Sequence, residues 1–306
     1  MAVSGSYDYT RTAIQIIKSS MRDIGELAKG QTPDADDYEV CLEALNLLIK
    51  SWQNQGIGLW LNQACILFLQ ADNTAYDLGP TGDHWTADGH KTELAVAAST
   101  GDLTITVDSY SGMADADYIG IELDSGVIDW TTIDTPAAVL ITIDDALAGA
   151  AAIDNHVYFY TDKAQKPIEI VKDGIIKVSS SGNQTPVSLI SRAEYMAIND
   201  KASEGTINSV YYDNQLTNGV LYVWPEPSDV KEYLAMTIRR PISDVDALTD
   251  HVEIPPEFLR ALEWNLALEI APKFEADVTK LMIYHAESSL MDARGLSREQ
   301  ASTYIR

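Results

Sequence analysis

The hydrophobic pattern changes its period twice along this chain of 306 residues, and that change most constrains the fold. Up to about residue 55, and again after about residue 255, apolar residues recur at three- and four-residue spacing, which is typical of amphipathic helices. Between these ends, short segments alternate apolar and polar residues, which is typical of strands. The sequence therefore predicts an α+β protein with helices at both chain ends and a β-rich middle.

Two helices are predicted at the N-terminal end. The first ends at Gly30, and Thr32 caps the second, with Pro33 at its first helical position. The second helix ends at Gly56. Its predicted buried stripe consists of Tyr38, Cys41, Leu42, Leu45, Leu48, Ile49 and Trp52.

Two more helices are predicted at the other end. Pro255 and Pro256 introduce the first, Pro272 breaks it, and a second runs from about Asp277 to Arg294. Its predicted stripe consists of Val278, Leu281, Met282, His285, Ala286 and Leu290. Because each pair leaves an apolar stripe uncovered, we expect all four helices to form one discontinuous bundle, a helical domain of residues 1–70 and 251–294.

The middle of the chain divides into two predicted β parts. Residues 91–162 contain LTITV, IGIEL, VLITI and VYFY, separated by turns, which predicts an inserted small antiparallel β-sandwich or barrel. Residues 71–90 and 163–250 form a β-rich segment that we expect to pack on the helical domain. In it, IEIVKDGIIKV is predicted to be a hairpin that turns at Asp173 and Gly174.

The charge balance excludes one class of function. The chain has 21 basic and 46 acidic residues, a net charge of −25, and such a chain repels DNA phosphates. Broad nucleic-acid binding is therefore not expected. Cys41 and Cys65 are too few for a disulfide framework and are predicted to be core residues. No secretory signal and no membrane span is predicted, so we expect synthesis in a cytoplasm.

Candidate catalytic and metal-binding motifs mostly fail their spacing tests. The stretch GDHWTADGH brings His84 and His90 close to Asp83 and Asp88, but this spacing matches no zinc or calcium template and favours a polar turn. No dinucleotide loop, phosphate loop or nucleophile elbow is complete. The sequence therefore predicts no catalytic, cofactor-binding or metal-binding residue, and no enzyme.

Two other function classes stay open. One is a glycan hydrolase that uses a pair of carboxylates. The candidate carboxylates, which lie in apolar or aromatic surroundings, are Glu194, Glu204, Glu226 and Glu269. A carbohydrate-binding or adhesion module is the other, suggested by aromatic residues in and near the insertion. These residues are Trp85, Tyr110, Tyr118 and Trp130.

The order of several motifs resembles a known family. They are MRDIGELAKGQTPDADDYEVCLEALNLLIKSWQNQGIGLW near the start, then ISRAEYMAIND, VYYDNQ, GVLYVWPEPSD and VEIPPEFLRALEWNLALEIAPKF. In this order they resemble head-to-tail adaptors of tailed bacteriophages, the tail accessory or packaged-DNA-stabilisation family of short-tailed phages. The resemblance covers both ends and the second β segment. Residues 91–162 depart from the smallest, mainly helical members, so the role of the insertion does not carry over.

The resemblance implies a structural protein of the virion, assembled in the host cytoplasm and placed at the head–tail junction. It implies a ring, commonly of twelve copies, that binds the portal protein and extends the DNA channel. The ring helps to retain packaged DNA and offers an attachment surface to tail or nozzle proteins. An acidic lumen would let DNA slide through without sequence-specific binding.

The last segment, GLSREQASTYIR at residues 295–306, is predicted to dock on the portal. Its charge departs from the acidic rest of the chain, and two apolar residues lie beside its basic ones, a composition that interfaces favour. The candidate portal-binding residues are Arg294, Arg298, Tyr304, Ile305 and Arg306. The alternative is a solvated tail.

Overall fold

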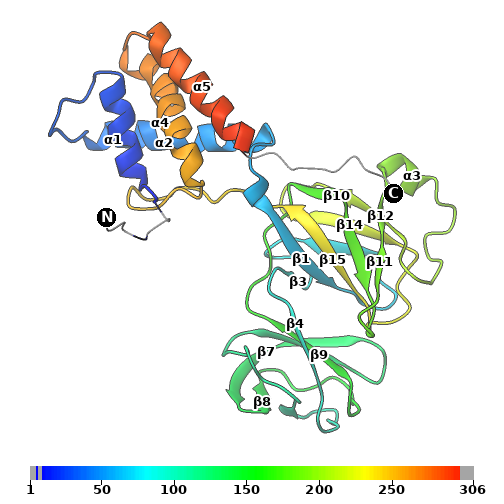
Figure 1. The fold of residues 1–306 in the computed structure, drawn as a ribbon. Helices are drawn as coiled ribbons and strands as arrows, with labels where there is room; N and C mark the ends of the chain where they lie inside the picture. Colours follow the sequence, from blue (N-terminus) through cyan, green and yellow to red (C-terminus); the bar gives the residue numbers. More distant parts are fainter. Residues whose placement is uncertain (1–4, 6–8, 297–306) are drawn as a thin grey trace. The chain divides into compact units, whose positions relative to one another are not determined.

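The computed structural model describes residue 5 and residues 9–296. The chain forms two compact units, one from residues 1–60 and 242–306 and the other from residues 61–241. The first unit is built from helices of both chain ends, and the second is built mainly from β-sheets (Figure 1). The predicted α+β class, with helices from the two ends packed together, is confirmed.

Helix α4 is the centre of the helical unit, because it contacts α1, α2 and α5. Its buried residues include Leu259, Leu262 and Leu266, which recur at helical spacing. Just before α1, Thr12 forms an isolated antiparallel bridge with His251, so the two chain ends also meet through their backbones. The helices are α1 (Ala13–Asp23), α2 (Ala35–Asn54), α4 (Pro256–Ile270) and α5 (Lys280–Leu296), with 3₁₀ turns at Leu59–Leu61 and Ala271–Phe274.

The predicted start and stop signals were partly wrong. Helix α1 ends at Asp23 because Gly25, not Gly30, makes the first left-handed turn, at φ 87°. The N–H groups of Gly25 and Glu26 then bond to the carbonyls of Arg22 and Met21, which is a Schellman arrangement. Helix α2 is likewise capped by a different residue. Asp34, not Thr32, accepts the Asp37 N–H at 2.9 Å.

The predicted core stripe of the last helix was also partly wrong. Helix α5 begins at Lys280, not near Asp277, so Val278 lies before it, and both Val278 and Leu281 are exposed. Apart from Met282, small side chains line the buried side of α5, which suits close approach to α4. The buried residues of α5 are Met282, Ala286, Ser289 and Ala293.

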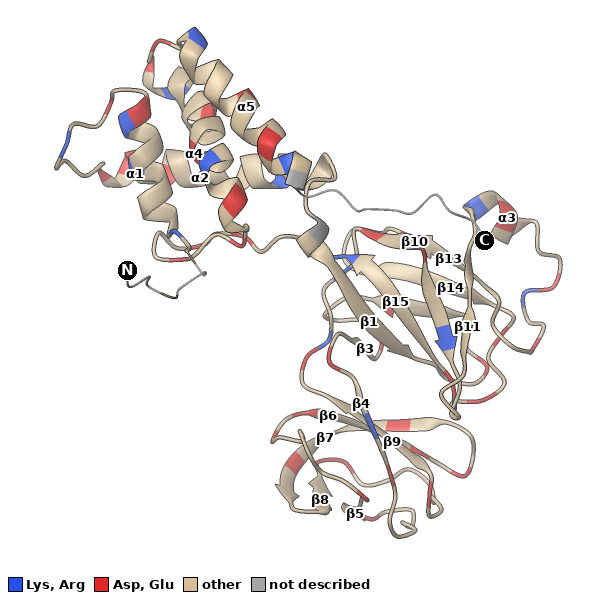
Figure 2. Ribbon diagram, in the orientation of Figure 1, with Lys and Arg blue, Asp and Glu red and all other residues tan. Residues whose placement is uncertain are grey.

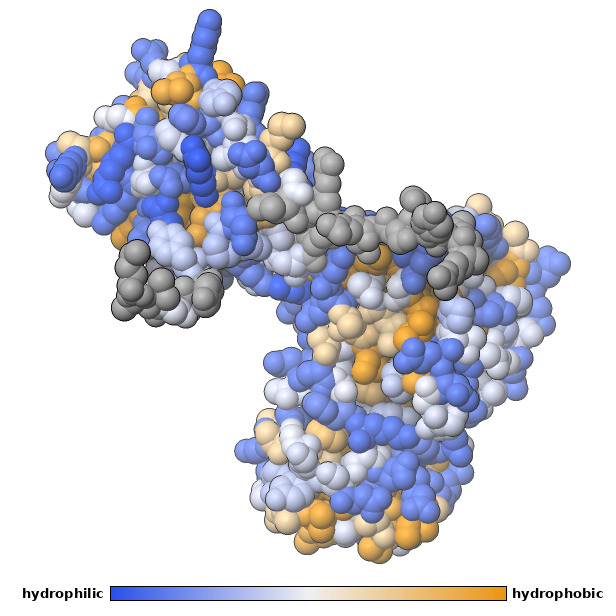
Figure 3. Space-filling view, in the orientation of Figure 1, coloured by the Kyte–Doolittle hydropathy of each residue, from blue (hydrophilic) through white to orange (hydrophobic). Residues whose placement is uncertain are grey.

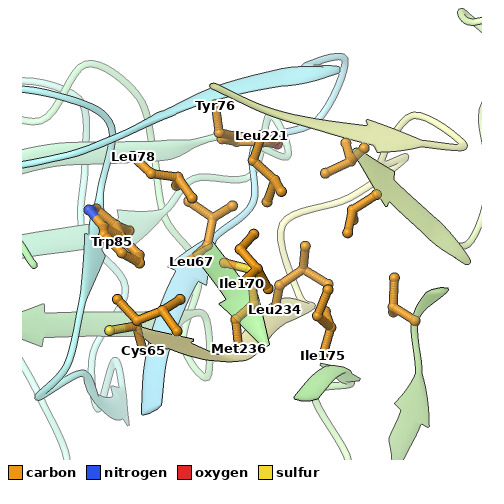
Figure 4. Packing of buried hydrophobic residues seen from close by; sticks show 14 of the residues in the cluster. Cys65, Leu67, Tyr76, Leu78, Trp85, Ile170, Ile175, Leu221, Leu234 and Met236 are labelled. Atoms are coloured by element: carbon orange, nitrogen blue, oxygen red, sulfur yellow. The ribbon is translucent and has the colours of Figure 1, made fainter. Parts of the chain in front are cut away.

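Two sheets face each other as a sandwich and enclose one core (Figure 4). Leu67 and Leu234 come from one sheet and Leu221 and Tyr76 from the other, all almost fully buried. The first sheet has the order β11 (Gln184–Pro186), β10 (Glu169–Val178), β15 (Tyr233–Arg239), β1 (Asn62–Phe68), β3 (Trp85–Thr86). The second has the order β12 (Ser188–Leu189), β13 (Ser209–Asp213), β14 (Gly219–Trp224), β2 (Ala75–Leu78).

Strand β14 is apolar on both faces because both faces are covered. Leu221 and Val223 point into the sandwich core. On the other face, Tyr222 packs against Tyr195 of the short helix α3 (Arg192–Met196), with ring centroids 5.2 Å apart. The Trp224 Nε1–H donates to the carbonyl of Asp200 at 3.0 Å, and the Trp224–Pro225 peptide is cis.

The predicted hairpin at residues 168–178 was wrong. Residues Glu169–Val178 form one strand, β10, which pairs with β15 on both sides of a bulge between Ile170 and Ile175. Asp173 adopts a left-handed conformation at φ 63° inside this bulge. An Asp-Gly pair in that conformation can therefore make a bulge as well as a turn, and pairing with β15 decides between them.

The insertion is a closed antiparallel barrel, one of the two predicted alternatives. Its order is β4 (His90–Glu93), β9 (His156–Tyr160), β6 (Tyr118–Glu122), β7 (Ile128–Ala137), β8 (Leu140–Ile143), β5 (Thr104–Thr106). The barrel closes where Leu94, just after β4, bridges to Val107 and the Ala95 N–H donates to the Thr106 carbonyl at 2.9 Å. Ile119, Ile121 and Val157 are fully buried in its core.

The boundary between the helical and β parts differs from the predicted ranges. Asn62–Phe68, placed in the helical domain by the sequence, is strand β1, because this short apolar run pairs along its whole length with β15. Residues 242–250, placed in the β segment, belong to the helical unit. There the side chain of Asn46 bonds to the backbone N–H and carbonyl of Val245, both at 2.9 Å.

Candidate interaction surfaces

Helix α5 carries a row of large apolar side chains on its outward side. Leu281, Tyr284 and Met291 are 64%, 63% and 76% exposed. Their spacing of three and seven residues places them on one helical face, with the half-buried Ser288 between them. We call Leu281, Tyr284, Ser288 and Met291 the α5 face. Figure 3 shows apolar side chains, in orange and tan, among the hydrophilic surface of the helical unit.

The inward side of α5 is fixed by small residues and polar contacts. Ala286 and Ala293 are almost fully buried. The Asn265 side chain of α4 donates to the carbonyl of Ala286 at 3.3 Å, and Trp264 stacks on His285 with ring centroids 4.8 Å apart. Apart from the buried Met282, helix α5 therefore buries small side chains, and it exposes several large ones. A row of large exposed apolar side chains on one helical face is typical of a helix with a second partner.

Helix α2 has an outward face of a different character. Glu39, Glu43, Leu47 and Ser51 follow each other at four-residue spacing, and all are exposed. Leu47 is 58% exposed. We call these four residues the α2 face. It is acidic toward the start of the helix and uncharged toward its end, and Figure 2 shows how widely acidic residues, in red, are spread over the fold.

A cluster of charged side chains lies between α1 and α4. Arg11 forms an ion pair with Glu263, and the Ser19 hydroxyl donates to the same carboxylate. The nearby Asp23 has a buried Oδ2 without a hydrogen-bond partner among the described residues. Burial, followed by the negative charge of Glu263, raises the pKa of Asp23 to about 6. The sequence reasoning missed this cluster because Arg11 precedes the first helix.

An aromatic seam joins the barrel to the sandwich. Phe68 of β1 packs against Trp130, Tyr158 and Tyr160 of the barrel, with centroids 4.9–5.9 Å apart. The Gln70 side chain bonds to both the N–H and the carbonyl of Ile128 at 3.0 Å. The barrel therefore shares a buried cluster with the sandwich, so the two chain connections are not its only attachment to the sandwich.

The candidate metal residues have separate partners. His84 stacks on Trp130 at 3.9 Å and its Nδ1 lies 2.6 Å from the Tyr160 hydroxyl. Burial, followed by the charge of Lys163, lowers the pKa of His84 to about 3, so the ring is neutral at pH 7. His90 stacks on Phe159 instead. Over residues 9–296, no three His, Cys, Asp or Glu side chains gather as ligands for a metal ion.

The four candidate carboxylates are dispersed. Glu269 is exposed on α4 in the helical unit, whereas the other three belong to the β unit. Glu194 caps α3 by accepting the Ser191 N–H at 2.7 Å, and this hydrogen bond lowers its pKa. A general acid needs a raised pKa, so Glu194 does not fit that role. Glu204 and Glu226 are neighbours through a parallel backbone bridge.

The candidate carbohydrate-binding aromatics do not form one exposed platform. Trp85 is fully buried in the sandwich core. Trp130 and Tyr118 are half-buried and pack into the seam. Tyr110 is exposed on the barrel.

Of the five candidate portal-binding residues, the structure describes one. Arg294 is exposed in the last turn of α5 and donates a hydrogen bond to the Gln55 side chain, just after α2. Arg298, Tyr304, Ile305 and Arg306 lie outside the described residues.

Comparisons with known proteins do not assign this chain to a family. No family model and no curated protein matches the sequence. Among solved structures, 22% of this chain is similar to the tailspike gp61 of Pseudomonas phage phi297, at 14% identity and a TM-score of 0.21. The similarity covers 14% of the tailspike chain, and a TM-score this low does not establish a common fold. None of the described helices is long and apolar enough to cross a membrane.

Proposed function

We propose that this chain is a structural subunit of a bacteriophage head-to-tail connector. In this proposal, copies of the chain form a ring, commonly of twelve, between the portal and the tail. The ring extends the DNA channel, helps to retain packaged DNA and carries tail proteins. It acts through symmetric contacts and not through turnover.

One observation carries the proposal: the α5 face. Helix α5 exposes Leu281, Tyr284 and Met291 to solvent. Exposed apolar area of this kind marks a surface that binds another protein. The order of the sequence motifs, which resembles that of phage head-to-tail adaptors, favours a connector ring as the assembly that would use this surface. The charge of −25 adds a function for the ring, because an acidic lumen repels DNA and keeps it mobile.

Binding to the portal tests this proposal. The full chain, mixed with portal rings encoded by the same genome, is expected to co-sediment with them. A chain that ends at Leu296 is expected to keep its melting temperature and lose portal binding, because residues 297–306 carry two of the three arginines and both apolar residues proposed to dock.

Two results would count against these statements in different ways. If the full chain does not bind portal rings at any concentration tested, the connector function is wrong. If the shortened chain binds with unchanged affinity, only the docking role of the last ten residues is wrong.

A further inference from the structure

Helix α1 carries a basic pocket in a chain that is otherwise acidic. The pocket lies within the helical unit and has a volume of about 400 Å³. It is lined by Tyr9, Thr10, Arg11, Gln15, Lys18 and Arg22. We propose that this pocket, which we call the α1 pocket, binds a phosphate group. Such a site goes beyond the connector function and does not depend on it.

The local sequence makes one side of α1 basic. Gln15, Lys18 and Arg22 are separated by three and four residues, so they lie on one helical face. Arg11 reaches the same face from just before the helix, because its Nη2 donates to the carbonyl of Gln15 at 2.7 Å. From Arg11 to Arg22 the chain has three cations and no acid. Three positive charges therefore converge on one pocket of a chain whose net charge is −25.

Two of these three cations are available to a ligand. Arg11 forms an ion pair with Glu263, so it shapes the wall of the pocket while its charge is offset. Lys18 is half-buried and Arg22 is exposed, and neither has an ion-pair partner among the described residues. Glu263 and Asp23 belong to the cluster between α1 and α4 and do not line the pocket. An anion in the pocket would therefore meet two unpaired positive charges.

The chemistry of the lining favours phosphate over other anions. Every lining side chain is of a kind that donates hydrogen bonds to phosphate oxygens in nucleic-acid complexes: arginine, lysine, threonine, glutamine or tyrosine. A phosphate monoester carries about −1.5 to −2 charges at pH 7, which matches two unpaired cations, whereas a carboxylate carries one charge. No aliphatic side chain is among the described residues that line the pocket. The pocket therefore suits the phosphate group itself and not an apolar ligand body.

Two sources can supply this group. One is a free phosphate-bearing molecule, and the other is the backbone of a nucleic acid, such as DNA in the channel of a connector. The acidity of the chain does not exclude the second source, because exposed charges more than about 8–10 Å away are largely screened at physiological salt. The contact would stay local. A second pocket of the helical unit, of about 540 Å³, is lined by the acids Glu26, Asp34 and Asp37 and repels anions.

Removing the two unpaired cations tests the inference. The pocket variant carries Lys18→Gln and Arg22→Gln, and the control variant carries Lys29→Gln and Lys273→Gln. Lys29 and Lys273 are exposed in the same unit and do not line the α1 pocket, so the two variants have the same net charge. None of the four side chains forms an ion pair with a described residue, so both variants are expected to keep the wild-type melting temperature.

Two measurements follow the group and its source. Calorimetric titration with inorganic phosphate, against sodium chloride of matched ionic strength, measures binding of the group itself. The wild type and the control variant are expected to bind, and the pocket variant to bind at least about tenfold less tightly. Fluorescence anisotropy of labelled DNA duplexes of two unrelated sequences measures binding of the backbone. If DNA is the source, both duplexes bind equally, and the slope of log affinity against log salt is smaller by about 2 in the pocket variant.

The outcomes separate the sources from failure of the site. Phosphate binding that is lost only in the pocket variant, without DNA binding, assigns the pocket to a free phosphate-bearing molecule. If the wild type binds no phosphate, or if the pocket variant binds it as tightly as the wild type, the inference is wrong. If a polyglutamate peptide binds and phosphate does not, the pocket takes the carboxylates of a protein partner and the inference is also wrong. Co-sedimentation with portal rings tests the connector function independently of all these results.

Discussion

Asp23 makes the stability of the helical unit depend on pH. Its carboxyl group lies close to Glu263, and burial with that neighbour raises its pKa to about 6. A pKa that is higher in the folded state than in the unfolded state means that folding favours the protonated form. The stabilisation is complete below about pH 4, the usual pKa of an unfolded Asp, and is lost as the pH rises through about 6.

Asp23→Asn is therefore expected to flatten this pH dependence and to stabilise the helical unit at pH 7, because the amide carries no charge beside Glu263. Urea unfolding followed by helical circular dichroism, between pH 4 and pH 7, measures the effect. Asp277→Asn is the control, since Asp277 is exposed in the same unit. If the unfolding free energy of Asp23→Asn depends on pH as strongly as that of the wild type, this carboxyl group does not titrate between pH 4 and pH 7.

At the scale of elements, α4 holds the two chain ends together. Leu45 of α2 and Leu266 of α4 are both fully buried. Truncating either to alanine leaves a cavity in a core that both chain ends share, so each is expected to cost roughly 2–5 kcal/mol of unfolding free energy.

Leu47→Ala is the matched control for these two truncations. It lies on the same helix as Leu45 but points outward, so it is expected to change the stability of the dilute monomer by less than about 0.5 kcal/mol. Chemical denaturation of all three variants measures these differences. Wild-type stability for both Leu45→Ala and Leu266→Ala would contradict a shared core.

The sequence predicted the existence of the helices better than their ends and faces. Periodicity is enough to place four helices and to pair them. It does not decide between Gly25 and Gly30, because both suit a left-handed turn and only the bonds to Arg22 and Met21 select the first. Nor does it say which stripe of α5 is buried, since that depends on how closely α4 approaches.

The candidate surface was missed for the same reason. Leu281 was predicted to be a core residue, Tyr284 and Met291 were not assigned to any face, and Leu47 was left out of the α2 stripe. A usable signal was present: α5 carries a second stripe of small residues, including Ala286, Ser289 and Ala293, that suits close packing. A helix with one small and one large apolar stripe has two candidate interfaces.

At the scale of the β unit, the barrel is an insertion whose ends lie side by side. His90 at the start of β4 pairs with Phe159 near the end of β9. Because paired residues of adjacent strands are close, a short Gly-Ser linker can replace residues 91–158 without moving the sandwich strands. The aromatic seam would be lost with the barrel. Removing the barrel uncovers Phe68 and Val230, which are buried in the complete chain.

The chain without the barrel is therefore expected to fold, to melt at a lower temperature and to bind a hydrophobic dye. Adding Phe68→Ser to the shortened chain is expected to reduce dye binding, because it removes the largest uncovered side chain of β1. Circular dichroism and dye fluorescence measure both effects. A shortened chain with wild-type melting and no dye binding would show that the seam contributes nothing.

For the whole molecule, the central claim is that the chain functions as a ring. Electron micrographs of the purified full chain, alone and on portal rings, test it most directly. The account predicts closed particles with a central hole and, for twelve copies of a 33.6 kDa chain, a mass of about 400 kDa. Compact particles of one or two copies under both conditions, without a hole, would contradict it.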